Sequence, residues 1–406
     1  MLSTARKQRG KKRPVDVAAA ARRGQTGVKR KRKEPLPTDV EDVVGAYLRY
    51  KTEPLTQGQF KEVVNHGLNL IVKPLATYAD TDRGQKEAVL AAAIGSMPGN
   101  LSVIHNPNAC LKAAANNGHA NLVGQLLREA KADVNVDRSL ALRSASYLGY
   151  PNVVTELIAA KADVTEVDNQ ALMDAAEQLH LEIVTALLAA KADVHAYYDF
   201  PVRVAASKGN LEIVNILLAA KADVRTKQNI ALRDAAKRGH LETVNALIGA
   251  KADIHACHNE SLRYAAKNNN LEIVNLLLGA NADVHSFGDE AFLSAAECGN
   301  LEVVKVLLDA QADVRGCNNL ALCSAVIKGN LQMVNLLLAA GADIHANGHE
   351  PLLFAARNGH LQIVQVLVEA KADLTSVVRD IIPEVLYRGY TEISSFLLGQ
   401  CEDAGL

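Results

Sequence analysis

Tryptophan is missing from this sequence, and only 4% of its 406 residues are aromatic. Apolar residues nevertheless make up 49% of the chain, and most of them are alanine, leucine, valine or isoleucine. Small aliphatic side chains of this kind are typical of short, regularly stacked helices. A large irregular core, which needs bulky aromatic side chains to fill it, is therefore not expected.

Long apolar runs are also missing, because none approaches the roughly 18 residues that a membrane-spanning helix needs. The first residues, MLSTARKQRGKKR, lack the apolar stretch of a secretory signal. No CxxC pair occurs among the six cysteines, which are Cys110, Cys257, Cys298, Cys317, Cys323 and Cys401. Together these absences predict no membrane contact, reduced thiols and an intracellular location, either cytoplasmic or nuclear.

The net charge of −1 hides a strong asymmetry between the two ends of the chain. Residues 1–37 contain 13 lysines and arginines but only two acidic residues, whereas the remainder is acidic. A segment that repels itself and buries little apolar surface does not fold alone. We therefore expect a disordered basic tail over residues 1–37.

An Ala-Asp dipeptide recurs at a fixed interval of 30 residues, with its aspartate at Asp133, Asp163, Asp193, Asp223, Asp253, Asp283, Asp313, Asp343 and Asp373. A fixed period of this length indicates stacked supersecondary units. Within one unit, residues 229–256, the apolar spacing predicts a short helix that ends at Gly239 in a left-handed cap. A second amphipathic helix follows from Leu241, and an extended turn leads to the next unit.

The wording of the unit resembles the ankyrin repeat, as in GHLETVNALIGAKADIHA and GNLQMVNLLLAAGADIHA. The resemblance covers residues 105–399. It implies an all-α ankyrin-repeat solenoid of about ten helix-turn-helix units. It also implies a non-enzymatic scaffold that binds a partner protein on its concave face. Each unit is three residues shorter than the usual 33. The β-hairpin that joins successive ankyrin units, called the finger, is therefore expected to be shortened. Short units in this style resemble those of giant viruses and intracellular bacterial effectors, which implies an effector acting in a host cell.

The regions outside the regular units are interpreted as end pieces. Residues 38–104 contain three apolar stretches with helical spacing and are expected to form a helical N-terminal cap or a small module. Residues 378–399 keep the register of the units but lack a following Ala-Asp, so they are interpreted as a C-terminal cap unit, followed by a tail over residues 400–406.

One alternative gives the N-terminal module an active role. Leu36-Pro37, followed by Val40, Val43 and Leu48, faintly resembles the opening of an F-box, the helical module that recruits ubiquitin ligases. The chain would then be an adaptor whose residues 38–104 recruit a second factor or carry an unrecognised activity. The tryptophan expected later in an F-box is absent.

Lysine occupies the position two residues before the aspartate in most units, at Lys131, Lys161, Lys191, Lys221, Lys251 and Lys371. The ankyrin repeat usually has glycine in a left-handed conformation at this position. The resemblance therefore places these lysines, with a conformational cost of about 1–2 kcal/mol each, in left-handed backbone.

Positions that vary between units are the candidates for partner binding, because the invariant leucines and alanines fill the shared core. The candidates are Tyr147, Tyr197, Tyr198, Arg203, Lys227, Arg233, Arg263, Tyr264 and Phe287. Aromatic and arginine side chains are favoured anchors at interfaces, and the basic residues favour a partner surface that is acidic or mixed. Two structural interpretations stay open: the arginines, together with Arg143, brace the finger backbone, or the aromatics cover a neighbouring unit.

The run Lys29, Arg30, Lys31, Arg32 and Lys33 matches a nuclear-import signal, which predicts recognition by an import carrier. Two alternatives stay open, namely weak contact with nucleic acid through the tail and no specific role. Binding to nucleic acid would depend strongly on salt. The tail lacks the aromatic residues that stack on bases.

Catalytic and cofactor-binding motifs are missing. His195, His255, His285 and His345 share one turn position, so they are expected to be structural. His255, Cys257 and His258 lack an evident fourth ligand for zinc. The sequence predicts no catalytic residue, no cofactor and no metal site. Asn135 resembles the ankyrin asparagine that cellular hydroxylases modify, which would make the chain a substrate.

Overall fold

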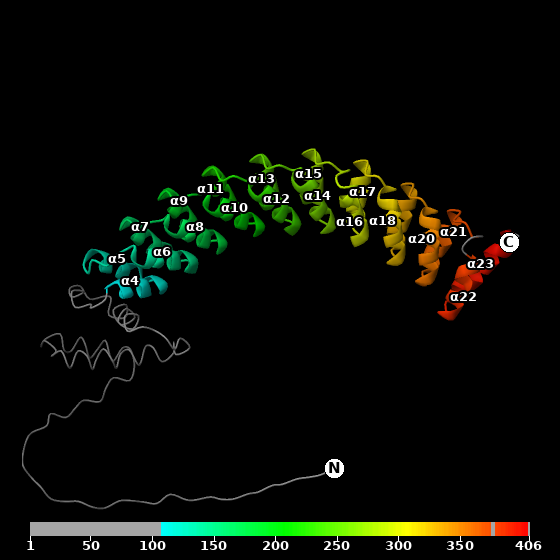
Figure 1. Cartoon of the computed structure of the whole chain (residues 1–406), viewed down its shortest axis with the longest axis horizontal. Coiled ribbons are helices and arrows are strands. Elements are labelled where there is room, and N and C mark those ends of the chain that lie inside the picture. Colours follow the sequence, from blue (N-terminus) through cyan, green and yellow to red (C-terminus); the bar gives the residue numbers. More distant parts are fainter. Residues whose placement is uncertain (1–106, 375–377, 405–406) are drawn as a thin grey trace, which may run out of the picture. The chain divides into compact units, whose positions relative to one another are not determined.

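The structure is a computed structural model that describes residues 107–374 and 378–404. Within these residues the regular structure is helical, and the helices follow one another in pairs (Figure 1). The first helices of the pairs are α4 (Pro107–Asn116), α6 (Val136–Leu148), α8 (Glu166–Glu177), α10 (Ala196–Ser207), α12 (Thr226–Arg238), α14 (Ala256–Lys267), α16 (Glu290–Cys298), α18 (Gly316–Ile327), α20 (Ala346–Arg357) and α22 (Val378–Tyr387). The second helices are α5 (Ala120–Arg128), α7 (Pro151–Ala159), α9 (Leu181–Ala189), α11 (Leu211–Ala219), α13 (Leu241–Gly249), α15 (Leu271–Gly279), α17 (Leu301–Asp309), α19 (Leu331–Ala339), α21 (Leu361–Glu369) and α23 (Thr391–Ala404).

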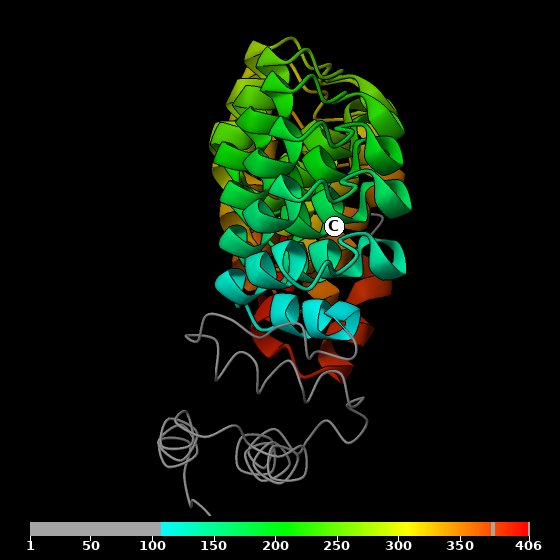
Figure 2. The same cartoon turned by 90° about the vertical axis from the view of Figure 1, so that its left-hand side faces the viewer.

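The pairs stack in sequence order, so that the first helices form one row and the second helices another (Figures 1 and 2). The core lies between the rows and runs through the described units. One leucine of each second helix, the equivalent of Leu217, is completely buried, as expected from the repeat; the series is Leu157, Leu187, Leu217, Leu247, Leu277, Leu307, Leu337 and Leu367. No described helix is long and apolar enough to cross a membrane.

The shortened finger between units takes the form of a left-handed turn at the start of the first helix. In α12, Lys227, Gln228 and Asn229 all have φ between 49° and 58° and ψ between 37° and 47°. The same three positions are left-handed in α6, α8, α10 and α14. Left-handed backbone costs about 1–2 kcal/mol per residue with a side chain, so the turn requires compensating interactions.

In the six units that begin with α8, α10, α12, α14, α16 and α18, the third residue of the turn supplies such an interaction to the next unit. Its buried side-chain oxygen accepts a hydrogen bond from the backbone N–H of the next Ala-Asp aspartate, at 2.7 to 3.0 Å. The acceptors are Asn169, Asp199, Asn229, Asn259, Asp289 and Asn319. Asn and Asp suit this position because they tolerate left-handed backbone and carry a short acceptor. We call this series the turn ladder.

The first described units use a variant of the same contact. Ser139 stands at the third turn position and donates its hydroxyl to Asn135 Oδ1 at 3.0 Å. The same Asn135 oxygen accepts the N–H of Asp163 at 2.7 Å, so Asn135 has a structural role. Asn108 accepts the N–H of Asp133 at 2.8 Å. The ladder therefore begins at the first described helix.

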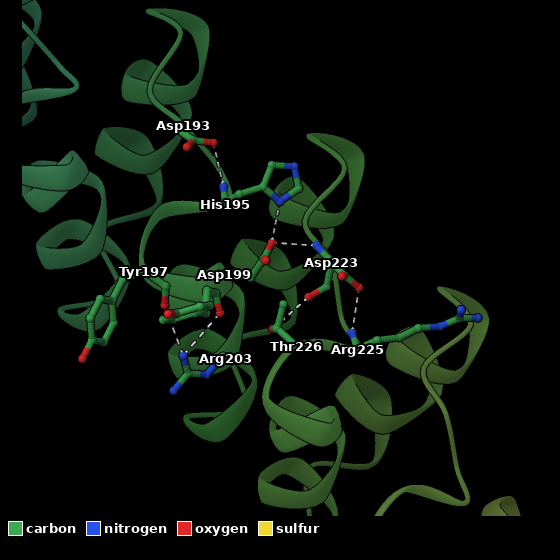
Figure 3. A network of polar contacts seen from close by, with 9 residues as sticks. Asp193, His195, Tyr197, Asp199, Arg203, Asp223, Arg225 and Thr226 are labelled. Atoms are coloured by element: carbon green, nitrogen blue, oxygen red, sulfur yellow. Dashed lines mark hydrogen bonds and ion pairs between the residues drawn. The ribbon is translucent and has the colours of Figure 1, made fainter.

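The recurring aspartate completes the turn within its own unit. Its Oδ1 accepts the N–H two residues further on, as Asp223 does from Arg225 at 2.9 Å (Figure 3). This arrangement is an Asx turn, in which the side chain imitates a backbone turn. In Asp163 the hydroxyl and N–H of Thr165 both donate to the carboxylate and lower the pKa of that carboxyl below its usual value.

A second series of contacts joins the first helices α6, α10 and α18 to the unit that follows each of them. His180, His240 and His360 each donate a ring N–H to a carbonyl near the end of the preceding first helix, at 3.1 to 3.2 Å. The ring of His240 lies against Gly209, where a Cβ would stand 2.4 Å from the ring nitrogen Nδ1. The φ of 73° at Gly209 gives a second reason for glycine at this position.

The lysines before the recurring aspartate adopt left-handed backbone, as expected. Their φ values lie between 50° and 72°, at Lys131, Lys161, Lys191, Lys221, Lys251 and Lys371. Gly341 fills the position in one unit with a φ of 89°. The conformation is therefore set by the turn, and glycine is the residue that adopts it without strain.

The last unit is held by a charged cluster and leaves apolar side chains exposed. Glu384 accepts hydrogen bonds from Arg357 at 2.8 Å and Arg388 at 3.0 Å, and the bond from Arg357 is the main cause of its lowered pKa. Leu386 is 51% exposed and Tyr387 is 92% exposed. α23 continues to Ala404, beyond residue 399 where the unit was expected to end.

Replacing the ladder acceptor tests its contribution to stability. Asn229→Ala leaves the N–H of Asp253 without its partner, so we expect a loss of about 1–3 kcal/mol in the free energy of unfolding. Asn229→Asp restores an acceptor, as Asp199 and Asp289 do in other units, and should recover at least half of that loss. Urea unfolding followed by circular dichroism measures both; equal losses in the two variants would contradict the ladder.

Replacing a left-handed lysine by glycine should raise stability. Lys221→Gly relieves strain at a φ of 72° and should raise the melting temperature, with a gain of about 1 kcal/mol. Lys221→Ala removes the charge but keeps a Cβ, so it should give no gain. A melting temperature that falls in Lys221→Gly would contradict the assigned strain.

Candidate functional site

The candidate site lies along the left-handed turns and the adjacent row of first helices. The turns hold bulky side chains away from the core, since Tyr197 is 64%, Tyr198 60% and Phe287 67% exposed. All three have positive φ, at 48°, 60° and 58°. Bulky residues seldom adopt this backbone, and strained positions of this kind cluster at functional sites.

Neighbouring turns touch one another through these side chains. Lys227 Nζ lies 4.0 Å from the ring centroid of Tyr198, which is a cation–π contact between adjacent units. Cys257 Sγ lies 3.1 Å from Gln228 Oε1, and the rings of His258 and Phe287 are 5.7 Å apart. The turns from Tyr197 to Phe287 therefore form one continuous surface, which we call the turn row.

Arginines of the first helices brace the turn backbone, as one of the open interpretations proposed. Arg203 Nη1 donates to the carbonyls of Tyr197 and Tyr198, both at 3.3 Å (Figure 3). Arg143 Nε donates to the carbonyl of Arg138 at 3.2 Å. In Figure 3 the Tyr197 ring points away from the network, while Asp199 points into it, toward His195 and Asp223.

The other two arginines share a buried carboxylate that sequence reasoning did not single out. Glu260 forms ion pairs with Arg233 of the preceding unit and with Arg263, the latter at 2.9 Å. Glu260 is 9% exposed. The sequence does contain a sign of this cluster: a glutamate near the start of a first helix, with Arg233 27 residues before it and Arg263 three residues after it. The pair of guanidinium groups is thereby held in one place on the first-helix row.

Tyr264 belongs to the same cluster. Its hydrogen bond to Glu260 is the main cause that raises the pKa of the phenol above its usual value. Lys237 Nζ lies 5.0 Å and the Arg263 guanidinium carbon 5.5 Å from the ring centroid. Cations therefore surround the ring, and the phenol is engaged by the protein itself.

The structure brings together most of the predicted binding residues but not all of them. Tyr197, Tyr198, Arg203 and Lys227 meet around two adjacent turns. A second group is formed by Arg233, Arg263 and Tyr264 around Glu260, and Phe287 lies on the turn row. Tyr147, which is 51% exposed, stands apart near the end of α6.

The histidines of the turn position have structural contacts. His195 and His285 direct Nδ1 at the ladder carboxylates Asp199 and Asp289, at 2.9 and 3.1 Å. No group of three or more side chains suited to a metal ion occurs in the described residues. Burial raises the pKa of the Cys323 thiol to about 11, so at neutral pH this thiol is protonated and a poor nucleophile.

Stacked helix pairs with an exposed row of turns define a helical-repeat protein. Comparison with protein families identifies which repeat this is. The family model for ankyrin repeats, described as three copies, matches residues 111–198, 172–257, 262–347 and 315–378. The chain belongs to the ankyrin repeat family, whose repeats are protein–protein interaction modules. A comparison with curated proteins finds no match.

Because Arg233 pairs with Glu260 and Lys237 does not, reversing the charge of Arg233 should destabilise the fold more than reversing that of Lys237. Arg233→Glu places a second carboxylate against buried Glu260 and should lower the free energy of unfolding by at least about 1 kcal/mol. Lys237→Glu reverses a charge on the same helix, but Lys237 is exposed, lies over the Tyr264 ring and forms no ion pair within the described residues, so it should change stability by less than half as much. Urea unfolding of both variants decides; equal effects would contradict the assigned role of Glu260.

Proposed function

We propose that this chain is an interaction scaffold that holds a partner protein against the turn row and the first helices of residues 190–290, and that the partner presents an acidic or mixed surface. The proposal is carried by one observation: Tyr197, Tyr198 and Phe287 are exposed on strained backbone and are linked by Lys227 and His258. Exposed aromatic and basic side chains held in fixed positions are favoured anchors for a protein partner.

The strain of the turn supports a binding role over a purely structural one. A stable turn at Tyr197 and Tyr198 would be served better by glycine or asparagine, since these residues adopt left-handed backbone at lower cost. The Tyr197 ring contacts the rings of Tyr198 and Phe200, at centroid distances of 5.9 and 6.3 Å, and Tyr197 does not belong to the core cluster. A partner that covers these rings gives their retention a physical reason.

The place of action is proposed from the sequence. Lys29–Lys33 match an import signal, which supports action in the nucleus. The short style of the repeats supports an effector role in a host cell. These residues and the segment 38–104, including its F-box-like alternative, lie outside the described residues.

The experiment compares partner capture by matched tyrosine variants. The tagged chain is incubated with a cell extract, and bound proteins are quantified by mass spectrometry. The amount of each specifically captured protein should be at least ten-fold lower with the double variant Tyr197→Ala/Tyr198→Ala, because the aromatic anchors are removed. Tyr387→Ala removes an even more exposed ring outside the proposed surface and should capture normally.

Both variants must show the circular dichroism spectrum and melting curve of the unaltered chain, since none of the three rings belongs to the core. Normal capture by the folded double variant would contradict the proposed surface. Equal losses in the double variant and in Tyr387→Ala would do so as well.

A further inference from the structure

Charge is distributed along the row of first helices in a bounded pattern. The three consecutive helices α10, α12 and α14, each taken with the residue after it, carry an excess of cations on the row. Apart from Lys227, which belongs to the turn row, these cations are Arg203, Lys208, Arg233, Lys237, Arg238, Arg263 and Lys267. Against them stand Asp234 and Glu260, while the third carboxylate of these helices, Asp199, is buried in the turn ladder. We call these seven cations the basic stretch.

The helices on either side of the basic stretch are acidic. α8 carries Asp174 and Glu177 on the row, and α16 carries Glu290 and Glu297; neither helix contains a lysine or an arginine. Glu177 and Glu297 are exposed and occupy the same position in their units as Lys237 does in α12. The basic stretch is thus bracketed by carboxylates at both ends.

The exposed cations of the stretch are available to a partner. Lys237, Arg238 and Lys267 are exposed, and none of them forms an ion pair within the described residues. Lys208 donates to the backbone carbonyl of Glu177 and not to a carboxylate. Glu260 neutralises part of the charge of Arg233 and Arg263 beneath them.

The length of the basic stretch follows from the distance between packed helices. Packed helices lie about 8–10 Å apart, so α10 and α14 are separated by about 20 Å. An extended chain advances about 3.3 Å per residue and covers this distance with about six residues. From α12 to α8 or to α16 the distance is again about 20 Å.

Resting on the proposed function, we infer that the partner presents an extended segment with an acidic block of about six residues, flanked on both sides by basic residues. The block lies across α10, α12 and α14, where the cations attract it. The flanks lie over α8 and α16, where Asp174 and Glu177 on one side and Glu290 and Glu297 on the other attract basic residues and repel a longer acidic run.

The bracketing carboxylates also favour a protein over a nucleic acid. A nucleic acid carries a negative charge on every nucleotide and cannot supply positive flanks. A strand that crosses the basic stretch would place phosphates over the carboxylates of α8 and α16. A peptide can vary its charge along its length and match the pattern.

Three fluorescein-labelled synthetic peptides of equal length test the charge pattern. Each has the same glutamate-rich centre of six residues; the flanks are lysine-rich in the first, serine-rich in the second and glutamate-rich in the third. Binding to the full chain is measured by fluorescence anisotropy at low salt. We expect the lysine-flanked peptide to bind at least ten-fold more tightly than the glutamate-flanked peptide, with the serine-flanked one between them.

A second test reverses the charge of the exposed carboxylates on both sides of the basic stretch. In the double variant Glu177→Lys/Glu297→Lys the preference between lysine and glutamate flanks should disappear or invert. The matched control Glu242→Lys/Glu272→Lys makes the same charge change at exposed positions of the second helices and should keep the original order. Melting curves confirm that both double variants fold.

The outcomes separate this inference from the proposed function. Equal binding of the lysine- and glutamate-flanked peptides, or an unchanged order in Glu177→Lys/Glu297→Lys, would overturn the charge pattern. So would tighter binding of a single-stranded oligonucleotide than of the lysine-flanked peptide. In each case tyrosine-dependent capture of a protein partner would still support the proposed function. Loss of that dependence alone would overturn the surface on which both rest.

Discussion

The hydrogen bond between a buried turn side chain and the backbone of the next unit is the interaction on which the array depends. Left-handed backbone is unfavourable for residues such as lysine, glutamine or tyrosine, and three such residues in succession need compensation. The side chain of Asn229 supplies it by accepting the N–H of Asp253. Without the acceptor on the preceding turn this N–H loses its protein partner, so each unit depends on its neighbour.

This dependence has a consequence for recognition. The acceptor is the third residue of the turn, and the two residues before it project outward with little constraint on their identity. Tyr197 and Tyr198 stand before Asp199, whereas Lys227 and Gln228 stand before Asn229. The fold therefore fixes one position per turn and leaves two free to vary, which lets neighbouring turns build a continuous surface without altering the core.

The sequence alone predicts the stack, because a 30-residue period with two helical patterns admits few other arrangements. The buried leucines follow from the same pattern, and the left-handed lysines follow from the resemblance to the ankyrin repeat. Bracing of the turn by Arg203 was one of two open interpretations, and the coordinates show it. Membership of the ankyrin repeat family confirms the expected fold. The leucine recurs through the series and the lysine in most units, so the 30-residue period makes both visible.

Contacts between units were harder to predict. A shortened finger was expected, but its left-handed form was not. The side-chain oxygen of the turn accepts a hydrogen bond from a backbone N–H 24 residues further along the chain, as Asn229 does from Asp253. Glu260 joins arginines of two units, and the period does not single it out, because the equivalent position is Glu290 in the next unit but Phe200 and Ile230 in the two preceding ones. Such contacts are specific to one pair of units and require coordinates.

Amide hydrogen exchange at the recurring aspartates tests the central interaction most directly. The N–H groups of Asp193, Asp223 and Asp253 lie between helices, where amides ordinarily exchange quickly. If the ladder joins the units, these three amides should exchange as slowly as those in the middle of the neighbouring second helices. Exchange at the rate of exposed loop amides would contradict the account.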